Sequence, residues 1–389
     1  MAAVRPLRPM PQPINTAEIS ERRGRFEAPE ISLIVPTYNE RANVALVVEK
    51  VATALAGLRW EIIFVDDNSP DGTASAVRAM GAADARIRCI RRVGRRGLAG
   101  ACIEGMLASQ APFVGVMDAD LQHDETALVP MLEALRDGEF DVAIGSRYVG
   151  DGSADDGFTK TRLGASKLAT TLTHRMLGIQ VSDPMSGFFM LRRDIVDQVA
   201  GDLAHEGFKI LADILASARG DLRVKDVPYG FRARQHGESK LDSQVAIDFL
   251  GLLISKATHN IMPVRFASFL LVGALGVGVH LCVLKAGLSL ADMSFSRAQI
   301  IATLVAMTTN FWLNNRLTYS DSRLKGLAAV RGLGVFYLIC AVGALSNIGV
   351  ATWLYSSQAH ASWWVAGFFG SVIGAVWNYA LSSTLVWKR

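Results

Sequence analysis

The sequence lacks the cysteine patterns that organise small folds and metal sites. Its four cysteines, at positions 89, 102, 282 and 340, are widely scattered, and no Cys-x-x-Cys pair occurs. This excludes the common zinc motifs and gives no sign of a disulfide framework. Free thiols are typical of proteins kept in a reducing cytoplasm.

Strong net charge and a secretory signal are also missing. A formal net charge of +4 over 389 residues is too small for a protein that coats nucleic acid, so nucleic acid is not expected as a partner. Residues 1–28 are rich in proline and arginine and lack the apolar core of a signal peptide. They are predicted to form a disordered tail, and a basic arm attracted to lipid is the alternative.

Charged residues become scarce in the last third of the chain, residues 263–389. Four long apolar runs stand there, at residues 265–290, 298–319, 330–355 and 363–387. Each has roughly the 20 residues that a helix needs to cross the hydrocarbon core of a bilayer. The sequence therefore predicts a membrane domain of four transmembrane helices, with membrane lipids as its surroundings.

The charges beside these runs predict how they are oriented. The loop after the second run contains Arg316, Arg323, Lys325 and Arg331, and the chain ends in basic residues, whereas residues 356–362 contain no lysine or arginine. Basic loops stay on the cytoplasmic side. Both termini and the whole region before the first run are therefore expected in the cytoplasm.

The apolar runs also contain an internal repeat. Val-Gly-Ala-Leu at 272–275 recurs at 342–345, and Asn-Phe-Trp-Leu at 310–313 recurs as Asn-Tyr-Ala-Leu at 378–381. We interpret this as two copies of a two-helix hairpin in which small residues allow close helix packing. Chance similarity between helices rich in glycine and alanine is the alternative. Whether the helices also join two copies of the chain stays open.

Residues 29–242 have the pattern of a soluble α/β domain. Short apolar runs alternate with segments of helical spacing, which predicts βαβ units and a mostly parallel sheet, with strands at 31–35, 61–65, 87–90, 113–117 and 141–145. Ligands bind beyond the carboxyl ends of such strands. Polar loops follow three of them, at 37–40, 66–72 and 118–124.

Two segments near the apolar runs are amphipathic, at 159–177 and 243–262. Such helices either pack on the soluble domain or lie in the lipid interface. The interface is favoured for both, because the predicted spans follow directly.

The strongest chemical motif is Asp118-Ala-Asp120, followed by Gln122. A strand here delivers two carboxylates into one loop, where they can share a hard cation with diphosphate oxygens. Mg²⁺ and Mn²⁺ prefer oxygen ligands of this kind. A solvated turn is the alternative.

Several motifs resemble those of known enzymes. Five segments are similar to family 2 glycosyltransferases of the GT-A fold, a Rossmann-like α/β fold: Pro-Thr-Tyr-Asn-Glu at 36–40, Val-Asp-Asp-Asn-Ser-Pro-Asp-Gly-Thr at 65–73, Gly-Leu-Ala at 97–99, Met-Asp-Ala-Asp-Leu-Gln at 117–122 and Ile-Gly-Ser-Arg-Tyr at 144–148. Three more resemble dolichol-phosphate mannose synthases and their bacterial relatives, at 183–189, 207–211 and 237–241. Residues 310–316, Asn-Phe-Trp-Leu-Asn-Asn-Arg, resemble the GtrA-like membrane domain.

This resemblance implies metal-dependent, inverting transfer of mannose from GDP-mannose to dolichyl or polyprenyl phosphate at the cytoplasmic face of the membrane. Two rivals stay open. One is a polyprenyl-phosphate glucosyltransferase that uses UDP-glucose. The other is a flippase for lipid-linked sugar whose soluble domain only binds a sugar nucleotide.

The resemblance also implies roles for individual residues. The nucleotide-sugar site would comprise Pro36, Tyr38, Glu40, Val65, Asp67, Asp118, Ala119, Asp120, Gln122, Arg147, Arg234 and Lys240. The metal would be bound by Asp118, Asp120 and Gln122, and the lipid phosphate by Arg147, Arg162 and Ser166. Asp120 and Arg147 would be the catalytic residues. The loop at 232–237 is longer than the family's, which leaves open which of its arginines reaches the diphosphate.

Structural roles compete with some of these functions. Arg162 is alternatively an arginine held by lipid headgroups, and Arg234 and Lys240 are alternatively exposed loop charges. We expect Asp66 to cap the helix that follows, Asp71 to serve only turn geometry, and His123 to be a polar bystander beside the metal motif.

Overall fold

The computed structural model describes residues 28–149, 171, 173–175, 181–204, 207, 209–218, 222–232, 243–258, 260–356 and 363–387. The predicted tail, apart from its last residue, and most of the amphipathic segment at 159–177 lie outside these ranges. Four of the predicted site residues also lie outside them: Arg162, Ser166, Arg234 and Lys240.

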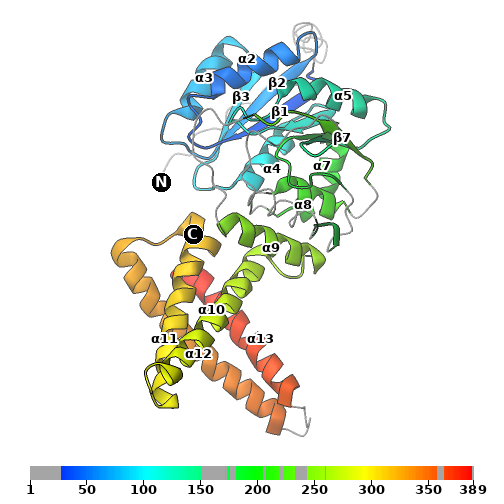
Figure 1. Cartoon of the computed structure of the whole chain (residues 1–389). Helices are drawn as coiled ribbons and strands as arrows, with labels where there is room; N and C mark the ends of the chain where they lie inside the picture. The colour runs from blue at the N-terminus through cyan, green and yellow to red at the C-terminus, as the bar shows by residue number, and fades with distance from the viewer. Residues whose placement is uncertain are drawn as a thin grey trace, which may run out of the picture.

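A seven-stranded mixed sheet forms the centre of the N-terminal domain (Figure 1). The order of its strands is β3-β2-β1-β4-β6-β5-β7. All five predicted strands form, as β1 (Ile31–Thr37), β2 (Trp60–Asp66), β3 (Ile87–Arg91), β4 (Phe113–Val116) and β5 (Val142–Ser146). β1 lies between β2 and β4 and is parallel to both. Together with the helices on both faces, this is the predicted Rossmann-like fold.

The sequence does not predict two strands, β6 (Phe189–Arg192) and β7 (Val224–Pro228). β6 lies between β4 and β5 and is antiparallel to both. Its first three residues are all buried, so it has no alternation of apolar and polar positions. β7 is an edge strand that ends in a proline, a residue that weakens any strand assignment from sequence.

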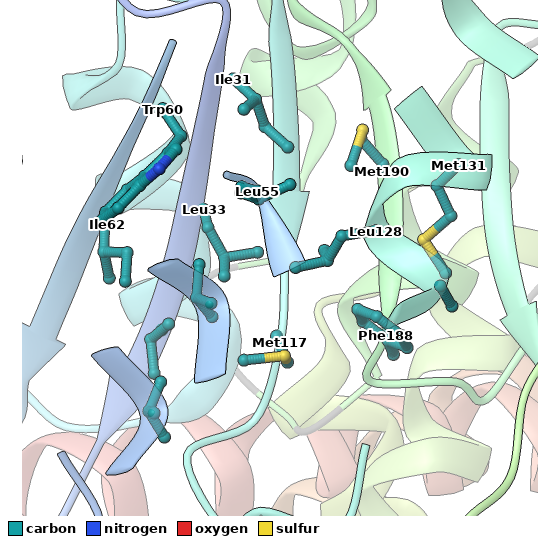
Figure 2. Packing of buried hydrophobic residues seen from close by; sticks show 14 of the residues in the cluster. Ile31, Leu33, Leu55, Trp60, Ile62, Met117, Leu128, Met131, Phe188 and Met190 are labelled. Carbon is teal, nitrogen blue, oxygen red and sulfur yellow. The ribbon is translucent and has the colours of Figure 1, made fainter. Parts of the chain in front are cut away.

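Helices cover both faces of the sheet. α2, α3 and α5 pack over Ile31 and Leu33, and Figure 2 shows Leu128 and Met131 of α5 in this cluster. α4, α7 and α8 pack over the opposite face, to which Ile34 belongs. Alternate residues of β1 therefore enter different cores. The helices are α2 (Val44–Ala54), α3 (Thr73–Ala83), α4 (Leu98–Ala108), η2 (Glu125–Ala127), α5 (Leu128–Arg136), α7 (Arg193–Val199), η3 (Ala200–Asp202) and α8 (Ile210–Ser217).

The C-terminal part is helical. It consists of α9 (Ser243–Ala257), α10 (Val264–Ser289), α11 (Phe295–Leu313), η4 (Asn314–Thr318), η5 (Ser320–Ser322), α12 (Gly326–Ser356), α13 (Trp363–Leu381) and η6 (Ser382–Val386). The long helices α10–α13 match the four predicted runs. Within the described ranges, α10 and residues Gly326–Ser346 of α12 are long and apolar enough to cross a membrane by length and composition.

The four long helices form two hairpins, α10 with α11 and α12 with α13. In each hairpin an asparagine faces a glycine of the partner helix: Asn310 faces Gly276, and Asn378 faces Gly343. The predicted repeat is therefore present. One detail differs, because the contacting glycine of the first hairpin is Gly276, which directly follows the 272–275 segment, and not Gly273 within it.

Each hairpin also ends in a π-helical turn, η4 in the first and η6 in the second. The residues directly after these turns, Tyr319 and Trp387, stack on each other with ring centroids 4.3 Å apart and planes at 4°. Asn315 accepts hydrogen bonds from the indole N–H of Trp387 at 3.0 Å and from the backbone N–H of Leu324 at 2.8 Å. The two repeats are thus joined through equivalent positions.

α9 lies between the sheet domain and the hairpins (Figure 1), and it contacts α8, α10 and η4. Its apolar residues Ile247, Phe249, Leu252 and Leu253 are buried within the protein. Of the two alternatives for this amphipathic segment, the structure therefore supports packing on the protein.

The contact between Gly276 and Asn310 predicts a strong size limit. A Cβ at Gly276 would overlap the side-chain amide of Asn310, so in Gly276→Val this side chain or its helix must shift. Overpacking of this kind costs about 1–3 kcal/mol of unfolding free energy. We expect a lower thermal midpoint for the protein in detergent. Gly278→Val, on the same helix, has open space around it and serves as the control. Equal midpoints for the two variants would contradict the packing.

Candidate active site

The loops that follow β1, β2 and β4 lie at one edge of the sheet, because these strands are neighbours and parallel. Each loop contains one residue other than glycine in the left-handed backbone region: Asn39 (φ 61°), Asn68 (φ 57°) and Leu121 (φ 62°). Asparagine adopts this conformation readily, but it is uncommon for leucine. Leu121 belongs to the Asp-Ala-Asp-Leu-Gln motif, so local strain is stored where the two carboxylates are presented.

The first two loops are tied together by hydrogen bonds. Backbone N–H groups of residues 39–41 donate to the side chains of Ser69 at 2.9 Å, Thr73 at 3.1 Å and Asp71 at 3.1 Å. The two loops therefore form one rigid wall of the site.

Asp66 and Asp71 both have structural roles in this wall. Asp71 has the predicted turn role, whereas Asp66 bonds within its own loop and does not cap α3, whose N-cap residue is Gly72. Asp66 accepts hydrogen bonds from the backbone and hydroxyl of Ser69. Asp71 accepts from the backbone and hydroxyl of Thr73 and from Arg41. Although partial burial disfavours its charged form, these hydrogen bonds lower the pKa of Asp71 below its usual value.

Asp67, a predicted nucleotide contact, is held by a buried arginine that the sequence reasoning missed. Arg92, only 4% exposed, donates to Oδ1 of Asp67 at 2.6 Å, and the backbone N–H of Gly97 donates to Oδ2 at 2.7 Å. Burial raises the pKa of Asp67, and both hydrogen bonds oppose the shift. Arg92 also contacts Glu104 on α4 at 3.1 Å. The only indication of a charge partner for Asp67 in the sequence is the cluster of arginines between residues 86 and 96.

The other predicted nucleotide-binding residues of β1, β2 and the metal motif come to the same edge. Pro36 and Val65 are the last residues but one of β1 and β2, and Ala119 is buried between the two aspartates. The guanidinium of Arg96 lies 4.8 Å from the ring centroid of Tyr38. Glu40 accepts a hydrogen bond from Asn43 at 2.7 Å.

Asp118 has an open face because the residue opposite is a glycine. A Cβ at Gly187 would lie 2.6 Å from Oδ2 of Asp118, so only glycine leaves this carboxylate its space. The side chain of Asp118 is 36% exposed, and Asp120 is also partly exposed. This contact gives a physical reason for the glycine in the Met-Ser-Gly-Phe segment.

The two aspartates are suited to share a metal with a substrate rather than to enclose one. Within the described part of the chain, no three His, Cys, Asp or Glu side chains are grouped to hold a metal ion. Magnesium is commonly bound by one or two carboxylates, substrate phosphates and water. Asp118 and Asp120, both partly exposed on one loop, fit that mode.

His123 is not the bystander that the sequence suggested. Its Nε2 lies 3.5 Å from Oδ2 of Asp118, and its Nδ1 lies 3.0 Å from the hydroxyl of Tyr229. A carboxylate can only accept, so a neutral imidazole carries its proton on Nε2 and accepts from Tyr229. Burial raises the pKa of Tyr229, which keeps its hydroxyl protonated as the donor. His123 therefore holds Asp118 in place.

Gln122, a predicted metal ligand, also joins two loops. The side-chain amide of Gln122 donates to the backbone carbonyl of Arg232 at 3.2 Å. In return, the backbone N–H of Arg232 donates to the backbone carbonyl of Gln122 at 2.8 Å. The guanidinium of Arg232 pairs with Asp124 at 3.0 Å and Glu125 at 2.7 Å. Of the two arginines in this longer loop, Arg232 is therefore engaged within the protein.

Arg147 is fixed in a nearly buried position. Its Nε and one terminal nitrogen donate to the same oxygen of Asp183 at 2.9 and 2.7 Å, and its side chain is 10% exposed. Burial works against the charge, but Asp183 outweighs it and raises the pKa of Arg147. Asp183 is fully buried. The guanidinium of Arg147 is therefore a permanent cation held at a defined place by Asp183.

Lys209 also belongs to this positive region. Its ammonium donates to the carbonyl of Met185 at 3.4 Å. Burial and then the charge of Arg147 lower the pKa of Lys209, whereas Asp183 and Asp118 act in the opposite direction. Two cations and the Asp118 carboxylate thus share one electrostatic environment.

Comparison with known proteins gives two family matches, one in the sheet domain and one in the C-terminal helical part. Residues 32–200 match the glycosyl transferase family 2 model, and residues 268–387 match the GtrA/DPMS transmembrane domain model. The second match identifies a membrane protein. Among solved structures, glucosyl-3-phosphoglycerate synthase from Mycobacterium tuberculosis in complex with UDP is similar, with 20% identity, a TM-score of 0.46, and coverage of 64% of this chain and 86% of that one.

Curated relatives are more similar. The dolichol-phosphate mannosyltransferase of Mycosarcoma maydis is 35% identical over 65% of this chain and 88% of its own length. That of Saccharomyces cerevisiae is 35% identical over 57% of this chain and 84% of its own. That of Pyrococcus furiosus is 32% identical over 361 residues, which are 92% of this chain and 99% of the relative. The chain therefore belongs to the dolichol-phosphate mannosyltransferase family of glycosyltransferases, with a family 2 catalytic domain joined to a GtrA/DPMS transmembrane domain.

Proposed function

We propose that this enzyme transfers mannose from GDP-mannose to dolichyl or another polyprenyl phosphate, with a divalent metal and with inversion at the sugar carbon. The observation that carries the proposal is the match to the Pyrococcus furiosus dolichol-phosphate mannosyltransferase along 99% of that protein. The carboxylates of Asp118 and Asp120 and the cations Arg147 and Lys209, brought to one edge of the sheet, support it.

The metal would be Mg²⁺ or Mn²⁺, held by Asp118 and Asp120 with the donor diphosphate. Its chemistry would be to compensate the negative charge that develops on the leaving nucleoside diphosphate. His123 keeps Asp118 oriented toward that position, since Tyr229 fixes its imidazole. Gln122 lies on the same loop and would lie beside the metal or complete its ligands.

Arg147 would bind the acceptor phosphate. A planar guanidinium presents several N–H donors in a fixed arrangement that matches a phosphate, and the ion pair with Asp183 fixes its orientation. A phosphate monoester is largely ionised near neutral pH, so its oxygen needs no general base to attack. The bond from the phosphate oxygen to the sugar carbon forms as the bond to the GDP oxygen breaks. A single displacement of this kind inverts the anomeric configuration.

The membrane domain would present the acceptor. We place both termini and the catalytic domain in the cytoplasm and all four long helices across the bilayer, which agrees with the basic residues at 316–331 and the absence of basic residues at 356–362.

The donor is tested by supplying the purified full-length protein in lipid vesicles with polyprenyl phosphate and either radiolabelled GDP-mannose or UDP-glucose. We expect labelled lipid from GDP-mannose and a β-linked product by NMR. Transfer from UDP-glucose alone would show that UDP-glucose, and not GDP-mannose, is the donor. An α-linked product would rule out single displacement.

Asp120→Ala is expected to lower kcat/KM by at least about 100-fold, since electrostatic compensation of the leaving group is lost. Chelation of divalent ions by EDTA should abolish transfer by the wild type, and Mn²⁺ or Mg²⁺ should restore it. Asp137→Ala, which removes an exposed aspartate after α5, is the matched control and should behave as wild type. Normal product from Asp120→Ala would refute the assigned role.

Arg147→Lys keeps a positive charge but removes the planar arrangement of donors. We expect KM for the lipid phosphate to rise by at least about tenfold, because a bidentate contact is lost, with a smaller effect on KM for GDP-mannose. The measurement is a steady-state titration of each substrate in vesicles. An unchanged KM for the lipid would show that Arg147 does not contact the acceptor.

A further inference from the structure

Lys256 on α9 is buried, although basic residues of amphipathic helices usually face solvent. Its side chain is 4% exposed, and its ammonium contacts three oxygens: Oδ1 of Asp213 at 2.6 Å, the carbonyl of Asp202 at 2.6 Å and the hydroxyl of Ser217 at 2.8 Å. These three acceptors use all three ammonium donors. The geometry fixes the ammonium in one position.

Asp213, the partner on α8, is equally constrained. Its side chain is 2% exposed, and its second oxygen accepts from the backbone N–H of Ala204 at 2.7 Å. Buried ion pairs of this kind add little to stability compared with apolar replacements, because both charges lose their hydration. In some proteins they instead specify one arrangement of the elements they join.

On one side, the ion pair leads to the active site. The backbone N–H of Asp213 donates to the carbonyl of Lys209 at 3.2 Å, one helical turn earlier. Lys209 stands directly before α8, in the electrostatic environment of Arg147 and Asp183. Any shift of α8 therefore moves the positive region that would receive the acceptor phosphate.

On the other side, α9 is joined to the membrane domain. A Cβ at Gly251 of α9 would lie 2.5 Å from the hydroxyl of Ser268 on α10, so the two helices touch. Ile247 packs with Val272 of α10 and Leu317 of η4. In Figure 1, α9 is the helix between the sheet domain and the hairpins. Lys256 is thus a polar link from the membrane helices, through α9, to the catalytic domain.

We propose that Lys256 is a positioning residue: its ion pair with Asp213 holds the catalytic domain in one orientation over the membrane helices, so that a bilayer-embedded acceptor meets Arg147. This rests on the proposed transfer to a lipid phosphate. A long-chain acceptor cannot change its depth in the bilayer, so the enzyme must be oriented for it. A short-chain prenyl phosphate dissolved in water can approach in any orientation.

The test compares these two acceptors with full-length protein in lipid vesicles. For Lys256→Met we expect kcat/KM with the long-chain polyprenyl phosphate to fall at least about tenfold, because small misplacements of reacting groups are costly. The value with the short-chain acceptor should stay at the wild-type level. Lys225→Met, at an exposed lysine of β7, is the matched control and should change neither value.

The double variant Lys256→Met/Asp213→Asn separates positioning from simple damage. It leaves no unpaired buried charge, and asparagine can still accept from Ala204, so it is the variant expected to fold well. The same selective loss in the double variant supports positioning. Recovery of the long-chain activity, or an equal loss with both acceptors, would overturn it. If the wild type transferred sugar to neither acceptor, the proposed function itself would fail.

Discussion

The arrangement of the active site depends on one constraint, the position of β1 between two parallel neighbours. Because β2 and β4 both run alongside β1, the loops after all three strands leave the sheet at the same edge. One loop carries the Asp118-Ala-Asp120 carboxylates, and the other two form a wall joined by hydrogen bonds. Residues 30 or more positions apart in the chain are therefore joined in one site.

Buried ion pairs then fix how charges are presented around that edge. Asp67 is held by Arg92, and Arg147 is held by Asp183. Water could not orient these groups in this way, and each needs a partner because a lone buried charge is very costly. The same principle extends to Lys256 and Asp213, which lie where the catalytic domain meets α9. The protein uses paired charges for orientation at both places.

Much of the fold could be read from local patterns. The five predicted strands form within two residues of their expected ends, and the four apolar runs form α10–α13. The sequence did not predict β6 and β7, because β6 is a short run whose first three residues are all buried and β7 ends in proline at the sheet edge. The repeat is visible in the sequence from the recurring asparagines. In the first hairpin, however, the asparagine contacts Gly276 rather than Gly273 of the repeated segment, because the packing of the helices decides which glycine it meets.

By itself, the sequence determined the α/β domain, the membrane helices and the Asp118-Ala-Asp120 motif, because periodicity and motif spacing are local properties of the chain. Only the tertiary structure decided which side chains act together. Arg92 meets Asp67, Gly187 makes room for Asp118, and His123 orients that carboxylate. Lys256 has the sequence pattern of a solvated charge, yet the packing of α9 against α8 buries it beside Asp213. Burial and pairing depend on contacts between distant segments, and no local pattern contains them.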